Sequence, residues 1–317
     1  MIDPQALVQE RLAHNSWGLL GSQGHILGID LGGYGLRAAL IDLHDHTYSS
    51  MQAPFSEENP EQAIAEAIAC AKQLLASKGV DTSRLVRIGV GFGGPIDIRH
   101  GIIRLAPRRP AWENFPLQAT FEQAFDATTL VDNDANLIAL GEATFGVGKG
   151  YTNLFYLHLS SGVGGGLVLD GRLYHGATAT AGEIGHAMVG AGKSATLEEL
   201  VSIGGLLRRA DELGLTTNNL ADLFSDHPAA QQVVRETTEV LALRLAQVAA
   251  LIDPQMIVLG GVVARIGGDT LVHGVAAQFN NFIAPAFVRP IPVVASVLGP
   301  DSIAIGCLAL ALESLYE

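Results

Sequence analysis

The sequence predicts an α/β protein made of two related lobes that face a central cleft. Apolar strand-like segments alternate with helix-like segments, and after Gly150 this order begins a second time. Glycines stand at matching places in the two halves, in Asp30-Leu31-Gly32-Gly33 and in Ser160-Ser161-Gly162-Val163-Gly164. The length of 317 residues is enough for two packed domains. The similarity between the halves is too weak to establish a repeat from sequence alone.

The first half is expected to begin its strands at Ile26. A helix is predicted over 60–77, because Ile64, Ile68 and Leu75 fall on one face, and Gly79 ends it. The other elements predicted for this half are a short helix and loose tail at 3–20, strands at 26–29, 36–43, 47–52, 86–92 and 128–131, and a helix at 117–125.

The second half repeats the alternation and ends in a helix. Its predicted strands are 153–159, 162–170, 255–259 and 293–296, and its predicted helices are 202–213, 228–252, 269–280 and 302–315.

Composition excludes several classes of protein. Hydrophobic residues make up 48% and charged residues 16%, so a large core is possible, but no apolar run reaches the roughly 20 residues of a membrane span. The N-terminus lacks the basic segment and the apolar segment of a signal peptide. Two distant cysteines, Cys70 and Cys307, are expected to be buried free thiols, which suits the cytoplasm. The net charge of −13 argues against nucleic acid as a partner.

The most informative segment is Val131-Asp132-Asn133-Asp134-Ala135-Asn136. A β-branched run ends there in clustered Asp and Asn and passes directly into an apolar helical pattern. Such a junction places Asp134 at the end of a sheet, where a carboxylate can orient a hydroxyl for attack on phosphorus.

Three glycine-rich turns follow predicted strands. Gly32, Gly33 and Gly35 form the first, Ser161-Gly162 opens the second, and Gly260-Gly261 forms the third. Without Cβ atoms, backbone N–H groups can approach an anion closely. Asp30 could then bind Mg²⁺ through water. Taken alone, the first turn is better explained as a plain β-turn, but three such turns favour a nucleotide site.

Two common nucleotide motifs are absent: no G-x-x-x-x-G-K-[ST] occurs, and no G-x-G-x-x-G opens a helix.

A polar cluster follows in Ala181-Gly182-Glu183-Ile184-Gly185-His186 and in Glu198-Glu199. Carboxylates, an imidazole and an amide that converge could satisfy the several hydroxyls of a sugar. The alternatives are a solvated helix start for the two glutamates and a buried core histidine for His186.

These residues together resemble the ROK family (repressors, open reading frames and sugar kinases), and within it the glucokinase-like members. The similarity runs from about Ile26 to Leu312. The segments that carry it are Gly28-Ile29-Asp30-Leu31-Gly33 with Arg37, Val131 to Asn136, Gly164-Gly165-Gly166 with Gly171-Arg172-Leu173-Tyr174, Ala181 to His186, and Val258-Leu259-Gly260-Gly261.

The resemblance implies a two-lobed actin-like ATPase fold of the ribonuclease H-like type, with a central cleft. The expected division is an N-terminal extension at 1–25, a smaller lobe at 26–131 plus 301–317, and a larger lobe at 132–300. It also implies a homodimer. The extension is expected to be too short for a winged helix, so a complete repressor is not expected.

The implied activity is ATP-dependent phosphorylation of a hexose or hexose derivative, commonly at the 6-hydroxyl. By the resemblance, Asp134 is the general base. The residues implied to bind the sugar are Asn133, Asp134, Glu183, His186 and Glu198. Those implied to bind ATP and Mg²⁺ are Asp30, Gly32, Gly33, Tyr34, Gly35, Ser161, Gly162, Gly260 and Gly261, with Asp30 near Mg²⁺.

The chain departs from the family pattern in four places. The family's cysteine zinc loop is replaced by the short segment 188–196, so no zinc is expected, since His186 alone cannot make a tetrahedral site. Tyr34 replaces a Thr or Ser and could narrow the ATP site. Arg108 replaces an Asn near the sugar; an anionic sugar or a plain surface loop would explain it. Ser160-Ser161 replaces Gly-Thr, a mild change.

Three hypotheses follow. A sugar kinase is favoured because Asp134 and the sugar cluster are retained. A non-catalytic, sugar-binding regulatory protein is the alternative, prompted by Tyr34 and the missing zinc loop. Another phosphotransferase on the same fold is the third.

Overall fold

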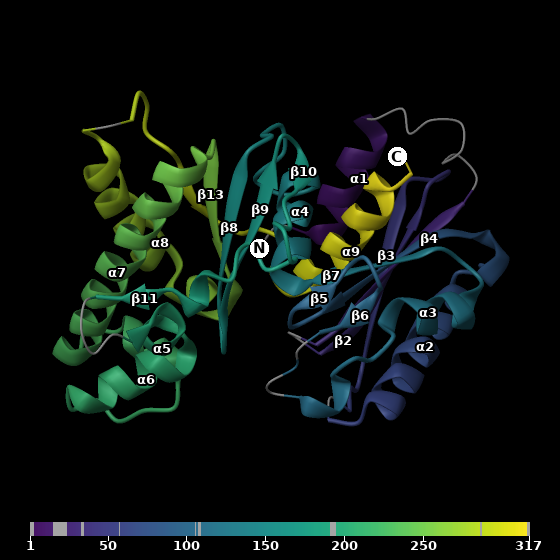
Figure 1. Ribbon diagram of the computed structural model, residues 1–317, viewed down its shortest axis with the longest axis horizontal. Helices are drawn as coiled ribbons and strands as arrows, with labels where there is room; N and C mark the ends of the chain where they lie inside the picture. The colour runs from purple at the N-terminus through teal and green to yellow at the C-terminus, as the bar shows by residue number, and fades with distance from the viewer. Residues whose placement is uncertain are drawn as a thin grey trace. The chain divides into compact units, whose positions relative to one another are not determined.

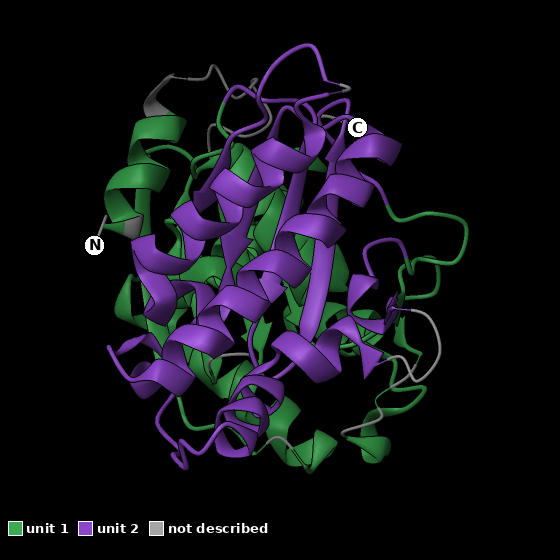
Figure 2. Ribbon diagram, turned by 90° about the vertical axis from the view of Figure 1, so that its left-hand side faces the viewer, with its two compact units in different colours: residues 1–149, 175–180, 297–317 green, residues 150–174, 181–296 purple. Residues whose placement is uncertain are grey.

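The computed structural model describes residues 3–14, 24–32, 35–56, 58–104, 106, 109–190, 195–285 and 287–315. The chain divides into two compact units, which Figure 2 shows in different colours. Unit 1 comprises Met1–Lys149, His175–Thr180 and Val297–Glu317, and unit 2 comprises Gly150–Tyr174 and Ala181–Ser296. The predicted lobe boundary after Val131 differs from this division, because helix α4 (Asp134–Thr144) packs on helix α9 (Ser302–Glu313) inside unit 1.

Unit 1 is built on a five-stranded sheet in the order β3-β2-β1-β4-β7. Figure 1 labels β2, β3, β4 and β7 of this sheet. Its strands are β1 (His25–Leu31), β2 (Leu36–Asp42), β3 (Thr47–Ala53), β4 (Leu85–Phe92) and β7 (Thr129–Asn133). The first three pair antiparallel, whereas β1, β4 and β7 run parallel to one another. β1 is buried from Ile26 to Leu31. Such continuous burial is typical of a strand covered on both faces.

Helices cover the two faces of this sheet. On one face, α2 (Pro60–Ser77) packs against β1, β2 and β3, and α3 (Leu117–Phe125) packs against β7. Their apolar side chains share one core with alternate residues of β1 and β4. On the other face, α9 approaches so closely that a Cβ on Gly89 would overlap the carbonyl oxygen of Cys307. Asp30 points to this second face, since Gly28 on the same face of β1 also contacts α9.

Unit 2 contains a second five-stranded sheet, in the order β10-β9-β8-β13-β14. Its strands are β8 (Leu154–Leu159), β9 (Val163–Leu169), β10 (Arg172–Leu173), β13 (Met256–Gly260) and β14 (Val293–Ala295). β8, β9 and β10 pair antiparallel, whereas β13 pairs parallel with both β8 and β14. The order and directions match those of unit 1, so the two related lobes predicted from the glycine spacing share one sheet topology.

The helices of unit 2 enclose its main apolar core. They are α5 (Leu197–Val201), α6 (Ile203–Glu212), α7 (Pro228–Ile252) and α8 (Gly261–Ile283).

The remaining elements of the two units are short. They are α1 (Pro4–His14), β5 (Ile96–Asp97), β6 (Ile102–Ile103), β11 (Met188–Val189), β12 (Ala195–Thr196), and the 3-10 turns η1 (Thr82–Arg84), η2 (Pro110–Trp112), η3 (Ile184–His186), η4 (Leu220–Phe224) and η5 (Gly299–Asp301). Within the described ranges, no helix combines the length and apolar character of a membrane span.

Several predicted boundaries are wrong by two residues or more, among them the end of the strand predicted over 26–29, which continues to Leu31. The strand predicted over 128–131 continues to Asn133, so the strand ends where α4 begins. The helix predicted from Asp269 begins at Gly261, eight residues earlier, and carries a kink at Gly268, whose φ is 50°. The glycine pair at this kink interrupts the helical pattern in the sequence, and this hid the first two turns.

Candidate active site

Asp134 lies at the first position of α4, directly after β7. Its Oδ1 accepts a hydrogen bond of 2.7 Å from the N–H of Ala135, and the side chain is partly exposed. The carboxylate therefore sits at the positive end of the helix dipole. The parallel partner of β7 ends beside it, because Phe92 of β4 is opposite Asn133 in the register.

Asn133 caps α4. Its Oδ1 accepts from the N–H of Ala135 at 2.9 Å, and its Nδ2 donates to the carbonyl of Gly94 at 3.0 Å. The first bond satisfies one of the unpaired N–H groups at the start of the helix, and the second ties the helix to the turn after β4. Asn133 and Asp134 are thus brought together in a fixed orientation.

Arg109 is a residue that the sequence analysis did not single out. Its Nη2 donates to the carbonyl of Gly93 at 3.1 Å, and its Nη1 donates to the carbonyl of Leu31 at 3.4 Å. The guanidinium carbon lies 4.3 Å from the centroid of the Phe92 ring, a cation–π contact. The only signal in the sequence is a pair of arginines before Pro110, which says nothing of where either side chain points.

The turn after β1 holds the predicted nucleotide residues of unit 1. Gly32 has a φ of 136° and Gly35 a φ of 98°, conformations that favour glycine. Gly33 and Tyr34 lie outside the described residues, so the prediction that the Tyr34 ring narrows the ATP site concerns a position that the structure does not describe.

Asp30 is 1% exposed. Beneath it, Cys307 Sγ donates to the carbonyl of Ile29, and burial raises the pKa of this thiol well above its usual value. A Mg²⁺ ion that arrives with a nucleotide keeps several waters and needs only one or two protein carboxylates. A single carboxylate at the end of β1 fits that requirement through water. The described residues contain no group of three or more metal-binding side chains.

A second buried acid lies next to the candidate base. Asp132, on β7, accepts hydrogen bonds from Asn136 Nδ2 at 2.9 Å and from the N–H of Asn133 at 2.7 Å. His175 Nε2 lies 2.6 Å from Asp132 Oδ2. This hydrogen bond raises the pKa of His175 above its usual value, although burial opposes the rise.

In unit 2, the predicted sugar residues gather around the start of β9. Glu198, on α5, accepts from the N–H of Val163 at 2.9 Å. η3 carries His186 and packs on β9, where Gly165 donates its N–H to the carbonyl of Gly182 at 2.7 Å. His186 Nε2 lies 3.9 Å from Glu183 Oε2, and the His186 side chain is 77% exposed. His186 is therefore not the buried core histidine that the sequence left open.

The predicted nucleotide residues of unit 2 lie at one end of its sheet. Ser161 and Gly162 form the tip of the β8–β9 hairpin. Gly260 pairs with His158 of β8, and a Cβ on Gly261 would overlap the carbonyl oxygen of Leu159. The structure thus brings these two turns together beside the end of β8, although the residues are about a hundred positions apart.

Besides Tyr34, two more of the predicted departures fall on residues that are not described. Arg108 is one, and residues 191–194 of the loop that replaces the zinc loop are the other. The absence of zinc therefore stays a prediction. Cys70 and Cys307 lie in α2 and α9 of unit 1, whereas His186 lies in unit 2.

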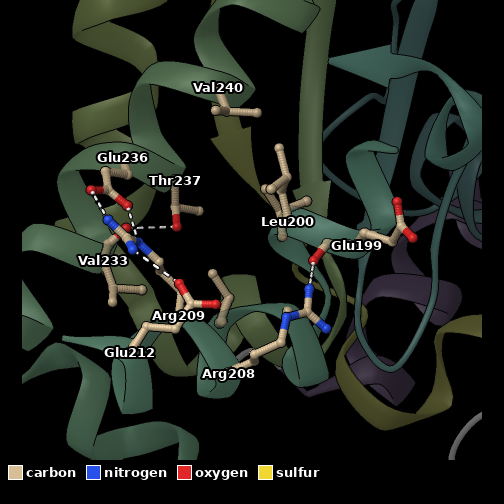
Figure 3. Close-up of a pocket in the computed structure, with 12 residues that line it drawn as sticks. Glu199, Leu200, Arg208, Arg209, Glu212, Val233, Glu236, Thr237 and Val240 are labelled. Atoms are coloured by element: carbon tan, nitrogen blue, oxygen red, sulfur yellow. Dashed lines mark hydrogen bonds and ion pairs between the residues drawn. The ribbon is translucent and has the colours of Figure 1, made fainter. Parts of the chain in front are cut away.

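Unit 2 also contains a cavity of about 170 Å³ between α5, α6 and α7. Figure 3 shows Arg209 joined to Glu236 and Glu212 on its wall, and the Glu236 carboxyl has a lowered pKa because of this contact. Arg208 donates to the backbone carbonyl of Glu199. The residues that line the cavity include Glu199 of the predicted polar cluster, but none of the residues that the resemblance implies to bind the sugar or ATP.

Comparison with known proteins gives a family and several relatives. Residues 26–314 match the model of the ROK family. A glucokinase from Halalkalibacterium halodurans is 30% identical over 308 residues, which cover 88% of this chain and 92% of that protein.

Solved structures agree with the fold. A ROK hexokinase from Thermus thermophilus has a TM-score of 0.81 at 28% identity, and the alignment covers 92% of this chain and 99% of that one. A ROK glucokinase from Streptomyces griseus, solved in complex with glucose and AMPPNP, has a TM-score of 0.74 at 25% identity. That alignment covers 92% of this chain and all of the other.

Proposed function

The chain belongs to the ROK family and has the two-lobed actin-like ATPase fold, and we propose that it is an ATP-dependent kinase of a hexose or hexose derivative that phosphorylates the 6-hydroxyl. The observation that carries this proposal is the place of Asp134. Its carboxylate lies at the end of β7 and at the N-terminus of α4, beside the turn that follows β4. Ligands of open α/β sheets bind outside the carboxyl ends of such strands.

In the proposed reaction, Asp134 is the general base. It takes the proton of the sugar hydroxyl while the hydroxyl oxygen forms a bond to the γ-phosphorus of ATP. The bond between that phosphorus and the bridging oxygen of ADP breaks, and its electron pair leaves with ADP. The hydrogen bond from the N–H of Ala135 fixes the orientation of this carboxylate.

The sugar is proposed to contact Asn133, Glu183, His186 and Glu198. These side chains offer both donors and acceptors, which a polyhydroxylated ligand requires. Two of them are already oriented by backbone contacts: Asn133 by Gly94 and Glu198 by Val163. Orientation before binding reduces the entropy that the protein loses when the sugar binds.

The nucleotide is proposed to contact the turns at Gly32 to Gly35 and at Ser161-Gly162, together with Gly260-Gly261. Their backbone N–H groups can approach phosphate oxygens closely because no Cβ intervenes at the glycines. Mg²⁺ bound to the ATP phosphates would contact Asp30 through water and would neutralise phosphate charge. We also expect a homodimer, which light scattering on the purified protein would test.

A coupled assay with ATP across a panel of hexoses and amino- and N-acyl hexoses tests the activity. The matching variant is Asp134→Asn, which keeps an oxygen to accept from the N–H of Ala135 but cannot take a proton. We expect kcat to fall by about 10²–10⁴-fold, the usual contribution of a general base. The affinity for the sugar, measured by calorimetry, should change little.

The control is Glu61→Gln, an exposed acid in the first turn of α2, which should leave kcat unchanged. Native turnover by Asp134→Asn would show that this carboxylate is not the base. A native protein that binds a hexose and phosphorylates none would reject the kinase and favour a sugar-binding regulator.

A further inference from the structure

The guanidinium of Arg109 is fixed where two parallel strands of unit 1 end. It donates to the carbonyl of Leu31 at the end of β1 and to the carbonyl of Gly93 just after β4. Its central carbon lies over the ring of Phe92, the last residue of β4. Three contacts from two neighbouring strands thus position one cation, although Arg109 itself is on the loop before η2.

This position lies between the proposed nucleotide turn and the proposed base. A Cβ built on Gly93 would stand 3.2 Å from Arg109 Nη2 and also 3.2 Å from Asp134 Oδ2. A Cβ built on Gly32 would stand 3.3 Å from Arg109 Nη1. One end of the guanidinium therefore borders the turn after β1, and the other end borders the space in front of the Asp134 carboxylate.

We propose that Arg109 is a catalytic residue of the phosphoryl transfer and that its guanidinium contacts oxygens of the γ-phosphoryl group as the group passes from ATP to the sugar. This inference rests on the proposed kinase function. The sugar hydroxyl must reach Asp134, and the ATP phosphates must reach the turn at Gly32. The transferred group passes between these two points, where the guanidinium lies.

The chemistry of the step calls for such a cation. The transferring group spreads negative charge over three equatorial oxygens while the bond to ADP breaks and the bond to the sugar oxygen forms. The proton goes to Asp134, and the electron pair of the broken bond goes to ADP. Asp30, Asp132 and Asp134 make the ends of these strands strongly acidic, so an anionic phosphoryl group requires compensation there.

Arginine suits this role better than lysine. Its guanidinium stays charged at all relevant pH values, and its planar fork can present two N–H groups to phosphate oxygens. The contacts with Leu31, Gly93 and Phe92 fix the group before substrate binds, so little reorganisation is needed in the transition state.

Two other roles would use the same contacts. Arg109 could serve only as a tie between the ends of β1 and β4, or it could recognise a negatively charged sugar. A tie affects stability and not the chemical step. Recognition of an acidic sugar affects KM for that sugar and spares neutral ones.

The test compares Arg109→Ala and Arg109→Lys with the native enzyme on its best neutral hexose. We expect Arg109→Ala to lower kcat by about 10²–10³-fold with little change in KM for the sugar, as when one charged donor to the transition state is removed. Millimolar guanidinium should restore part of the lost kcat, and urea should not. The kcat of Arg109→Lys should lie between that of the native enzyme and that of Arg109→Ala. This second variant keeps the test decisive if the alanine variant fails to fold.

The control is Arg104→Ala on the same loop, whose exposed side chain pairs with Asp97 at 2.9 Å. It should keep the native kcat. An unchanged kcat in Arg109→Ala would overturn the proposal. A lower kcat that guanidinium does not restore, in a variant whose thermal unfolding midpoint is also lower, would overturn it as well. A loss confined to KM of acidic sugars would also overturn it. A native enzyme that phosphorylates no sugar would reject the kinase function itself, and this inference with it.

Discussion

Glu142 provides a quantitative test of how the helix of the proposed base is fixed. It lies on α4, two turns after Asp134, and is completely buried. Its Oε1 accepts from the N–H groups of Val297 at 3.0 Å and Leu298 at 3.4 Å, and its Oε2 accepts from the N–H of Val147 at 3.0 Å. One carboxylate therefore joins α4 to the loop after it and to the segment that leads into α9.

Two substitutions divide this interaction into parts. Glu142→Gln keeps one oxygen for Val297 but turns an amide N–H toward the N–H of Val147, so one charge-assisted bond is lost at a cost of about 2 kcal/mol. Glu142→Ala removes every acceptor and leaves three N–H groups, one buried and two partly buried, without this partner. At about 1–3 kcal/mol for each unsatisfied group, and with partial access of water, the free energy of unfolding should fall by roughly 3–6 kcal/mol.

Urea unfolding followed by circular dichroism measures both values, provided that the slope with urea stays constant. Glu239→Gln on the exposed face of α7 is the matched control and should change stability little. Two outcomes would refute the assignment of these three bonds: a native free energy of unfolding in both Glu142 variants, or a lower free energy of unfolding in the glutamine variant than in the alanine variant.

Two further predictions concern the sugar cluster and pH. Gly182→Ala should raise KM for the sugar several-fold, because the new Cβ overlaps the Gly165 carbonyl and displaces the adjacent Glu183. The control is Gly171→Ala, since Gly171 also has a positive φ but no atom lies near its added Cβ. Equal KM values for the two variants would contradict this prediction. The pKa of His175 is raised in the folded state, so its stabilisation is complete below its ordinary value of 6.5 and is lost as pH rises through the folded pKa. The stability difference between native protein and His175→Gln should therefore shrink in alkali, and a difference that grows with pH would be inconsistent with this pairing.

The regular elements could be predicted because their signals are local. The apolar face of α2 and the continuous burial of β1 follow from spacing that a few neighbouring residues display. The start of α4 was equally visible, since Asn133 is a favoured capping residue directly before an apolar run. α8 was shortened because Gly268 breaks the periodic pattern at a kink that tertiary packing tolerates.

The site could be predicted only where a residue acts through its place at an element boundary. Asp134 is such a residue. Arg109 is not, because the two carbonyls that position it are 78 and 16 residues away in the sequence. His175 likewise contacts Asp132 across 43 positions. Single-sequence patterns contain no information about such distant pairs, whereas the structure places them directly.

The shared sheet topology of the two units explains why the glycine turns could be predicted from the sequence and why other parts of the site could not. β1 and β4 of unit 1 correspond to β8 and β13 of unit 2 in order and direction, so the turns after them correspond as well. Gly32 matches Ser161-Gly162, and Gly93-Gly94 matches Gly260-Gly261, which is why the glycine turns recur in the sequence.

The last strands of the two sheets, β7 and β14, occupy corresponding positions but are followed by different residues. β7 ends in Asn133 and runs into Asp134, whereas β14 is followed by Ser296, whose N–H donates to the carbonyl of Leu259. The side chain packed at the turn after β4 is likewise Arg109 in unit 1. In unit 2, the nearest atoms that a Cβ on Gly261 would meet are backbone atoms of Leu159 in β8. Under our proposals, the base and the phosphoryl-binding cation therefore both belong to unit 1, at the positions where the two sheets have diverged.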